Sequence, residues 1–271
     1  MNELEFINQR PEVSGRIKSG SPEARKRWFL DHYESVPHEI EEFLAGTGID
    51  FRGKRVVDLG CGDGSIALGV MNKFAPADLL GLELSPVDTE DLKTRAKEIL
   101  GIDLPLGLRF GTCEPESIPV ANAMSDLVMS WSVFEHVANP VVVMQEIHRI
   151  LRPGGLMFLQ IWPLYHSQRG SHLWNWYPDG WEHLQKSSNE LRKEFIEKFD
   201  MDEALQKEML VDYDSLNIIR VDQLQKAILA SGLVIRRVEL QSDLIDVPES
   251  LNHLSLNDLT TSGIKILAQR K

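Results

Sequence analysis

Cysteines and long hydrophobic runs are both scarce in this sequence, and their scarcity excludes several classes of protein. Cys61 and Cys113 are too few for a disulfide framework, and neither their number nor their spacing suggests a zinc site. A chain with so few cysteines is typical of a reducing compartment. No apolar stretch approaches the roughly 20 residues that cross a bilayer, and residues 1–10 lack the basic and apolar segments of a signal peptide. We therefore expect a cytoplasmic protein that does not bind a membrane.

Basic charge is scarce as well. The chain has 29 Lys and Arg residues against 41 Asp and Glu residues, which gives a net charge of −12. A nucleic-acid partner is not expected, because phosphate contacts require a basic surface. The 271 residues are 42% hydrophobic and 26% charged, as in ordinary globular proteins. A chain of this length can bury a core without disulfide bonds, and it fits one domain with insertions.

Short apolar runs alternate with helical periodicity along most of the chain. The predicted strands cover residues 55–59, 79–84, 106–110, 126–131, 156–162, 233–240 and 263–269. The predicted helices cover residues 66–74, 87–100, 141–151 and 221–231, and two more begin near Pro22 and Pro37. Strands that alternate with helices predict an α/β fold, in which helices cover both faces of a mostly parallel sheet.

Residues 163–220 interrupt this alternation. They are rich in Trp, His and charged residues, and we expect an insertion that is partly helical over about residues 189–210. The predicted organisation is a single domain over residues 1–271. Its parts are an N-terminal helical segment at 1–50, a core at 51–162 and 221–271, and the insertion at 163–220.

A glycine-rich turn follows the first predicted strand and reads Asp58-Leu59-Gly60-Cys61-Gly62-Asp63-Gly64. Glycines allow a ligand to approach the backbone closely, and the N–H groups at the start of the next helix can bind an anionic group. Nineteen residues after Gly64, Glu83 ends the second predicted strand, where an acid can accept both hydroxyls of a ribose. The pattern predicts a nucleoside-containing ligand at the carboxyl ends of the strands.

Two classes of ligand fit such a turn. Gly62-x-Gly64-x-x-Ala67 satisfies the loose dinucleotide fingerprint of NAD(P)-dependent oxidoreductases. However, Asp58 and Asp63 flank the turn and would repel a pyrophosphate, and the chain has no Tyr-x-x-x-Lys sequence of the kind that such an enzyme would need. S-adenosylmethionine carries no phosphate and is cationic at its ammonium and sulfonium groups. The carboxylates therefore favour S-adenosylmethionine.

The turn resembles the cofactor-binding motif of class I S-adenosylmethionine-dependent methyltransferases. Residues 80–85 resemble the second motif of that family, residues 125–137 resemble the fourth, and residues 151–155 resemble the turn before the fifth strand. The resemblance covers about residues 55–162, together with the terminal helix and strand pair. It implies a Rossmann-like, doubly wound sheet of seven strands, mostly parallel with an antiparallel last strand, and S-adenosylmethionine as the cofactor.

The resemblance also implies which residues bind the cofactor. Asp58 would hold the ammonium group and Glu83 the ribose, while Ser130 and Trp131 would flank the methyl group. Thr112 replaces an Asp that often contacts the adenine in this family. The full set is Asp58, Gly60, Cys61, Gly62, Glu83, Leu84, Thr112, Cys113, Ser130 and Trp131.

Three histidines are candidates for a catalytic role. Methyl transfer mainly requires alignment, although a hydroxyl acceptor also benefits from a general base, most often His. His166 and His172 follow the fifth predicted strand, where ligands of open α/β sheets bind, and we expect one of them to be the base. His136 is a third candidate, although Glu135-His136 is common in this family and we favour a structural role for it.

The same region offers groups for a metal ion and for the acceptor. Glu135-His136 also resembles the metal-binding pair of a subset of methyltransferases that act on quinone precursors. Ser132 stands where those enzymes have a further Glu, so we expect no metal site. Arg169 can pair with an acidic acceptor.

Aromatic residues of the insertion allow two interpretations. Trp174 and Tyr177 can stack on an acceptor, or they can form a small core under a long loop. The expected reaction is O-methylation of a hydroxyl on a small molecule or a glycan. N-methylation, an NAD(P)-dependent oxidoreductase and a non-catalytic cofactor-binding module are the alternatives.

Overall fold

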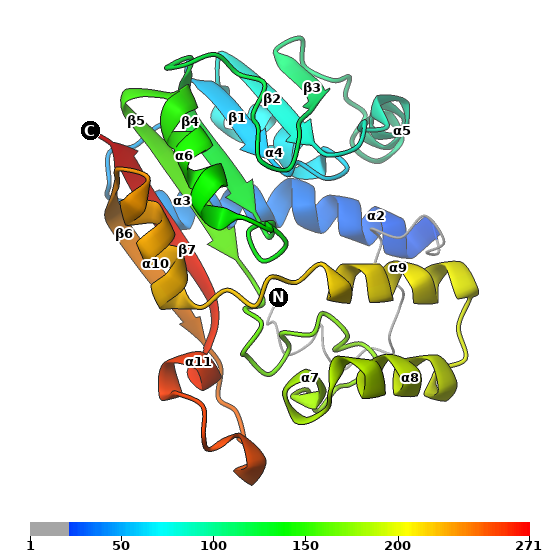
Figure 1. The fold of residues 1–271 in the computed structure, drawn as a ribbon. Helices are drawn as coiled ribbons and strands as arrows, with labels where there is room; N and C mark the ends of the chain where they lie inside the picture. Colours follow the sequence, from blue (N-terminus) through cyan, green and yellow to red (C-terminus); the bar gives the residue numbers. More distant parts are fainter. Residues whose placement is uncertain (1–21) are drawn as a thin grey trace.

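Seven strands form one sheet in the order β3-β2-β1-β4-β5-β7-β6 (Figure 1). The computed structural model describes residues 22–271. The strands are β1 (Arg55–Leu59), β2 (Asp78–Glu83), β3 (Leu108–Thr112), β4 (Ser125–Trp131), β5 (Leu151–Ile161), β6 (Leu233–Ser242) and β7 (Thr261–Arg270). β7 runs antiparallel to both β5 and β6, whereas the other neighbouring pairs are parallel. The predicted Rossmann-like sheet with an antiparallel last strand is confirmed.

Helices cover both faces of this sheet (Figure 1). The α-helices are α2 (Pro22–Leu30), α3 (Val36–Leu44), α4 (Ser65–Phe74), α5 (Thr89–Arg95), α6 (Pro140–Ile150), α7 (Glu182–Gln185), α8 (Ser188–Lys198), α9 (Glu203–Asp214), α10 (Val221–Ala230) and α11 (Leu256–Thr260). Single π-helical turns follow α2 (Asp31–Ser35) and α5 (Ala96–Leu100), and a 3₁₀ turn spans Glu249–Leu251.

Alternate residues of the strands enter two separate hydrophobic cores. On β1, Val57 packs with buried residues of α6 and α10, whereas Val56 packs on the opposite face with residues of α2, α3 and α4. Phe158 of β5 joins the second core and contacts the ring of Phe43 at a centroid distance of 5.5 Å. Because side chains alternate along a strand, a strand buried on both faces reads as a continuous apolar run. This explains why the short runs in the sequence predicted these strands.

Two predicted boundaries are wrong. The turn expected at residues 151–155 lies within β5, which pairs Leu151 with Ser125 and then Leu156 with Leu127. Five residues of β5 thus advance against two of β4, so the Pro-Gly-Gly sequence forms a bulge rather than a break. The stretch expected to be partly helical over about residues 189–210 extends to Asp214 and consists of two helices, α8 and α9, because the side chain of Asp202 accepts hydrogen bonds from the first turn of α9 and starts a new helix there.

The segment between β5 and α10 forms a layer at the end of the sheet where β5 finishes (Figure 1). It has a small core of its own, in which Leu173 and Tyr177 pack with residues of α8 and α9. Trp181 joins it to the connection between β6 and β7, where its indole N–H donates to the carbonyl of Asp246 at 3.1 Å. The segment is therefore packed in place rather than attached only at its two ends.

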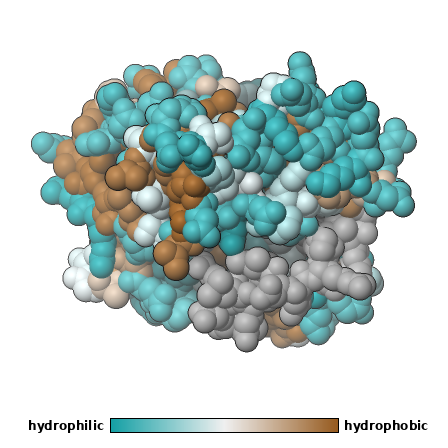
Figure 2. All heavy atoms as spheres, turned by 90° about the horizontal axis from the view of Figure 1, so that it is seen from below, coloured by the Kyte–Doolittle hydropathy of each residue, from teal (hydrophilic) through white to brown (hydrophobic). Residues whose placement is uncertain are grey.

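The surface at this end of the molecule is largely hydrophilic, with a hydrophobic band to one side (Figure 2). Among residues 22–271, none of the helices is long and apolar enough to span a bilayer. The start of the first predicted helix, at Ser21, and the rest of residues 1–21 lie outside the described residues.

Candidate active site

Asp58 lies at the carboxyl end of β1 and is almost completely buried, with 1% of its surface exposed. Its Oδ2 atom accepts no hydrogen bond from the described residues. Burial, together with the nearby carboxylate of Glu83, raises the pKa of Asp58 to about 7. An ionised carboxylate without a partner is costly to bury, so this position suits a ligand that brings a positive charge.

The glycines of the turn leave room for such a ligand. Gly60 has a φ of +76°, and a Cβ atom on it would lie 2.4 Å from a methyl carbon of Val133. Only glycine adopts this positive φ without strain and also has no Cβ atom that would collide with Val133. Gly62 also has a positive φ and faces open space, whereas Cys61 between them is buried, and burial raises the pKa of its thiol. Cys61 is therefore a neutral packing residue under the turn.

Glu83 lies beside this turn because β2 is the neighbour of β1 in the sheet. One carboxylate oxygen accepts a hydrogen bond from the N–H of Gly62 at 3.0 Å, and the other accepts one from the N–H of Leu84 at 2.9 Å. Each oxygen has a second lone pair, so the oriented carboxylate can still accept two ribose hydroxyls. Leu84 is 59% exposed and offers an apolar surface next to it.

The ends of β3 and β4 complete the edge of the sheet. Thr112 is in register with Glu83, and the N–H of Cys113 donates to the carbonyl of Glu83 at 2.9 Å, so both residues lie beside the expected ribose acid. Ser130 is buried, and its hydroxyl donates to the carbonyl of Leu59 at 2.9 Å, which ties β4 to β1. Trp131 is half-buried and stacks on the ring of Phe158.

Asp63 has a different role from the one its position in the sequence suggested. Its carboxylate pairs with Arg95 at 2.8 Å and accepts a hydrogen bond from the N–H of Ser65. It therefore braces the turn against α5 and caps α4. The repulsion expected for a pyrophosphate thus rests on Asp58 and Glu83, and the sequence offered no signal for the pairing with Arg95.

Four polar residues meet beyond the carboxyl ends of β4 and β5. Glu135 and His136 come from the turn after β4, His172 from the loop after β5, and Asp212 from α9. Nδ1 of His172 lies 3.2 Å from Oδ2 of Asp212, and Nε2 of His136 lies 3.9 Å from Oδ1 of the same carboxylate. The two imidazole rings are edge to face at 5.2 Å. We call these four residues the histidine cluster; sequence reasoning did not single out Asp212.

The structure distinguishes the two histidines of the insertion. His166 is buried, and its Nε2 accepts a hydrogen bond from Arg220 at 3.1 Å. Burial and the Arg220 charge lower the pKa of His166. Nε2 of His172, in contrast, is buried and has no hydrogen-bond partner among residues 22–271. This buried nitrogen without a partner in the described chain distinguishes His172 from His166.

The other predicted acceptor residues lie in different environments. Trp174 is half-buried, and its ring contacts those of His172 at 5.8 Å and Trp162 at 5.4 Å. Tyr177 is in the core of the insertion, packed against Phe195. No carboxylate pairs with the half-buried Arg169 in the described part of the chain. Trp174 and Arg169 are thus the residues of this group that remain accessible to an acceptor.

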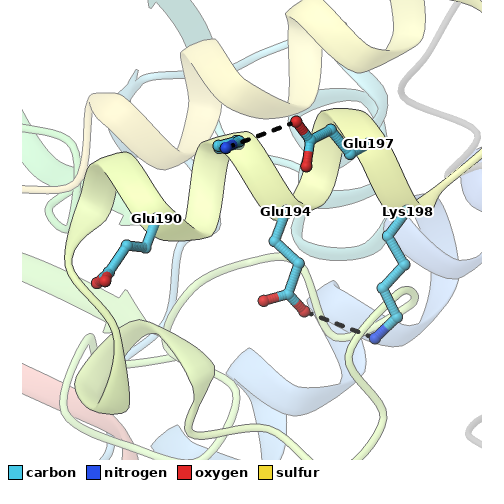
Figure 3. Close-up of a pocket in the computed structure, with 5 residues that line it drawn as sticks. Glu190, Glu194, Glu197 and Lys198 are labelled. Atoms are coloured by element: carbon cyan, nitrogen blue, oxygen red, sulfur yellow. Dashed lines mark ion pairs between the residues drawn. The ribbon is translucent and has the colours of Figure 1, made fainter.

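A surface hollow of about 380 Å³ lies along α8 (Figure 3). Its lining is Glu190, Lys193, Glu194, Glu197 and Lys198. The charges pair with one another, Lys193 with Glu197 and Lys198 with Glu194. The hollow is a solvated helix face, and we assign it no chemistry.

Comparison with known proteins identifies the family. The family described as "Methyltransferase domain" matches residues 29–236. The chain belongs to this family. It is a class I S-adenosylmethionine-dependent methyltransferase, and S-adenosylmethionine is its cofactor. The buried carboxylate of Asp58 and the exposed edge at Glu83 and Leu84 fit the cationic and nucleoside parts of that cofactor.

Curated relatives match only part of the methyltransferase. A ubiquinone biosynthesis O-methyltransferase from Parvibaculum lavamentivorans is 28% identical over 109 residues, which are 40% of each chain. A malonyl-[acyl-carrier protein] O-methyltransferase from Hahella chejuensis is 31% identical over 46% of this chain and 42% of its own. The matches thus span about two fifths of these relatives' length.

Solved structures resemble the methyltransferase over most of its length. An S-adenosylmethionine-dependent methyltransferase from Mesorhizobium loti has a TM-score of 0.53 and 18% identity. The likeness covers 90% of this chain and 98% of that one. At this identity it shows a shared fold.

Proposed function

We propose that this enzyme transfers the methyl group of S-adenosylmethionine to a hydroxyl oxygen of a small molecule. The acceptor binds between the glycine turn and the insertion, and residues 163–220 form its lid. The observation that carries this proposal is His172, whose side chain is 9% exposed and whose Nε2 has no partner in the described chain. A hydroxyl is the kind of acceptor whose proton must leave, so the reaction benefits from a polar cluster at this position.

Aromatic side chains support an acceptor that has a ring. Trp174 lies beside His172, Trp162 lies beside Trp174, and both indoles are half-buried; such faces stack on planar rings or on the apolar face of a sugar. The names of the two curated relatives describe O-methyltransferases, which agrees with an oxygen acceptor.

The reaction needs few groups of the protein itself. The acceptor oxygen attacks the methyl carbon as the bond from that carbon to the sulfonium breaks, and the products are the methyl ether, S-adenosylhomocysteine and one proton. Asp58 and Glu83 hold the two ends of the cofactor, so the methyl group faces the histidine cluster. Alignment of this kind can supply a large part of the rate enhancement.

A panel of acceptors tests the proposal. The purified enzyme is incubated with S-adenosylmethionine and with phenols, sugars, carboxylic acids and amines, and methylated products are identified by mass spectrometry. We expect an O-methyl product, and we expect His172→Ala to lower turnover at least about tenfold. His166→Ala is the matched control and keeps most of the activity. Exclusive N-methylation, or full activity of His172→Ala, would refute the proposal.

A further inference from the structure

The histidine cluster has the arrangement of a metal site. Glu135, His136 and His172 each place one potential ligand atom within 4.8 Å of the others. Metal–ligand bonds of about 2.0–2.2 Å put ligands up to roughly 4 Å apart. Side-chain movements of less than about 1 Å would therefore bring the three atoms around one cation.

His172 provides independent support for a ligand at this place. A carboxylate can only accept, so Nδ1 of His172 donates to Asp212, and in the neutral imidazole Nε2 then carries the lone pair. That nitrogen is buried without a partner in the described structure. Metal-binding histidines commonly donate their second ring N–H to a carboxylate, which fixes the tautomer and orients the ring. The contact between His172 and Asp212 has this form.

Backbone geometry also holds His172 in place. Its φ is +62°, a conformation that a non-glycine residue adopts only where its surroundings impose it. The side chain is directed towards the turn after β4, where the ring of His136 meets it and Nδ1 of His136 contacts the hydroxyl of Ser215 at 2.7 Å. Two segments of the chain and the carboxylate of Asp212 thus converge on one point.

We propose that Glu135, His136 and His172 bind a divalent transition-metal ion, with Asp212 orienting His172. Two imidazoles and one carboxylate suit Zn²⁺ or Mn²⁺, whereas Mg²⁺ prefers an all-oxygen shell. This proposal replaces the expectation from the sequence that there is no metal site. That expectation rested on Ser132, which stands where a subset of methyltransferases has a further Glu ligand. Ser132 instead donates its hydroxyl to Gln160 at 2.9 Å and takes no part in the cluster.

The role of the ion rests on the proposed O-methylation. Three protein ligands leave a coordination position for the acceptor hydroxyl. A coordinated hydroxyl loses its proton to solvent at a lower pH than a free one, because the cation stabilises the oxyanion. That oxyanion then attacks the methyl carbon and the sulfonium leaves as a neutral thioether, so charge and atoms balance.

Metal binding can be tested without knowing the acceptor. The untagged full chain is stripped with a chelator, dialysed against Zn²⁺ or Mn²⁺, and assayed for bound metal by mass spectrometry and for affinity by calorimetry. We expect one ion per chain, no competition from Mg²⁺, and loss of that ion in His172→Ala and Glu135→Gln. Asp212→Asn should weaken binding about 10- to 100-fold, as expected for a residue that orients a ligand.

Matched controls separate this site from a surface one. His38 is exposed beside Glu41 and Glu42, so His38→Ala removes an adventitious site and should leave the stoichiometry at one. S-adenosylmethionine binding, measured on each variant, shows that the variant is folded. Absence of a stoichiometric ion in the wild type, or its retention in His172→Ala, would overturn the metal site. If metal-free enzyme O-methylates its acceptor at full rate in the presence of a chelator, the proposed role of the ion in the reaction is overturned, while the proposed O-methyltransferase function stays intact.

Discussion

The buried carboxyl group of Asp58 makes cofactor affinity depend on pH. Its pKa is raised to about 7, mainly by burial and also by the charge of Glu83. In the proposed site the ammonium group of S-adenosylmethionine pairs with the ionised form. Below pH 7 the carboxyl holds a proton that must leave before the pair forms, so affinity should fall as pH decreases through 7 and should gain little further from this carboxyl above about pH 8.

The size of the effect follows from the pKa. At about pH 5.5, which is 1.5 units below the value of about 7, roughly 3% of the carboxyl is ionised. Affinity should then be about 25-fold weaker than at about pH 7.5, which corresponds to about 2 kcal/mol at 1.36 kcal/mol per unit. The α-amino group of the ligand remains largely protonated across this range, since such groups titrate near pH 8.

Calorimetry in two buffers of different ionisation enthalpy measures both quantities. We expect close to one proton released on binding near pH 5.5 and about a quarter of a proton near pH 7.5. Asp58→Asn keeps the shape of the side chain and should bind weakly with no dependence on pH. A wild-type affinity that is constant from pH 5.5 to 7.5, or a slope that persists in Asp58→Asn, would show that Asp58 does not hold the ammonium group.

Three further predictions concern the turn, its neighbour and the core. Glu83→Ala should weaken S-adenosylmethionine binding by about 1.5–3 kcal/mol in calorimetry, while Glu90→Ala on the exposed face of α5 leaves it unchanged; equal affinities would contradict the ribose assignment. Gly60→Ala places a Cβ atom 2.4 Å from a carbon of Val133, so cofactor affinity should fall at least tenfold in the same assay, and wild-type affinity would disprove the steric argument. Phe158→Ala removes a fully buried ring and should lower the free energy of unfolding by about 3–5 kcal/mol in a urea titration, whereas a loss below 1 kcal/mol would mean that the core closes around the gap.

Local sequence predicted the sheet well because its strands are buried on both faces. Continuous apolar runs such as residues 55–59 match β1 to the residue. The bulge at the start of β5 was missed, since Pro-Gly-Gly forms a turn in isolation and pairs as a strand only when β4 lies beside it. The separation of α8 from α9 has a local signal in Asp202, a helix-capping residue.

The proximity of the two acids expected to bind the cofactor could also be predicted from the sequence. Asp58 and Glu83 end neighbouring parallel strands, and such ends meet at one edge of a sheet, so their proximity could be predicted from the strand order. The ion-pair partner of Asp63 could not be predicted from the sequence. Arg95 is 32 residues away on α5 and reaches the turn only through the packing of that helix.

The amino-acid sequence by itself determined the fold and the cofactor, and it predicts the edge of the sheet at which the cofactor binds. These depend on short-range patterns, namely apolar periodicity, a glycine turn and the spacing of one acid. Only the tertiary structure decided that Nε2 of His172 is buried without a partner in the described chain, and which carboxylate contacts the other nitrogen of that ring. His172 and Asp212 are 40 residues apart and on different elements, and no local pattern encodes a contact that arises when the insertion folds onto the end of the sheet.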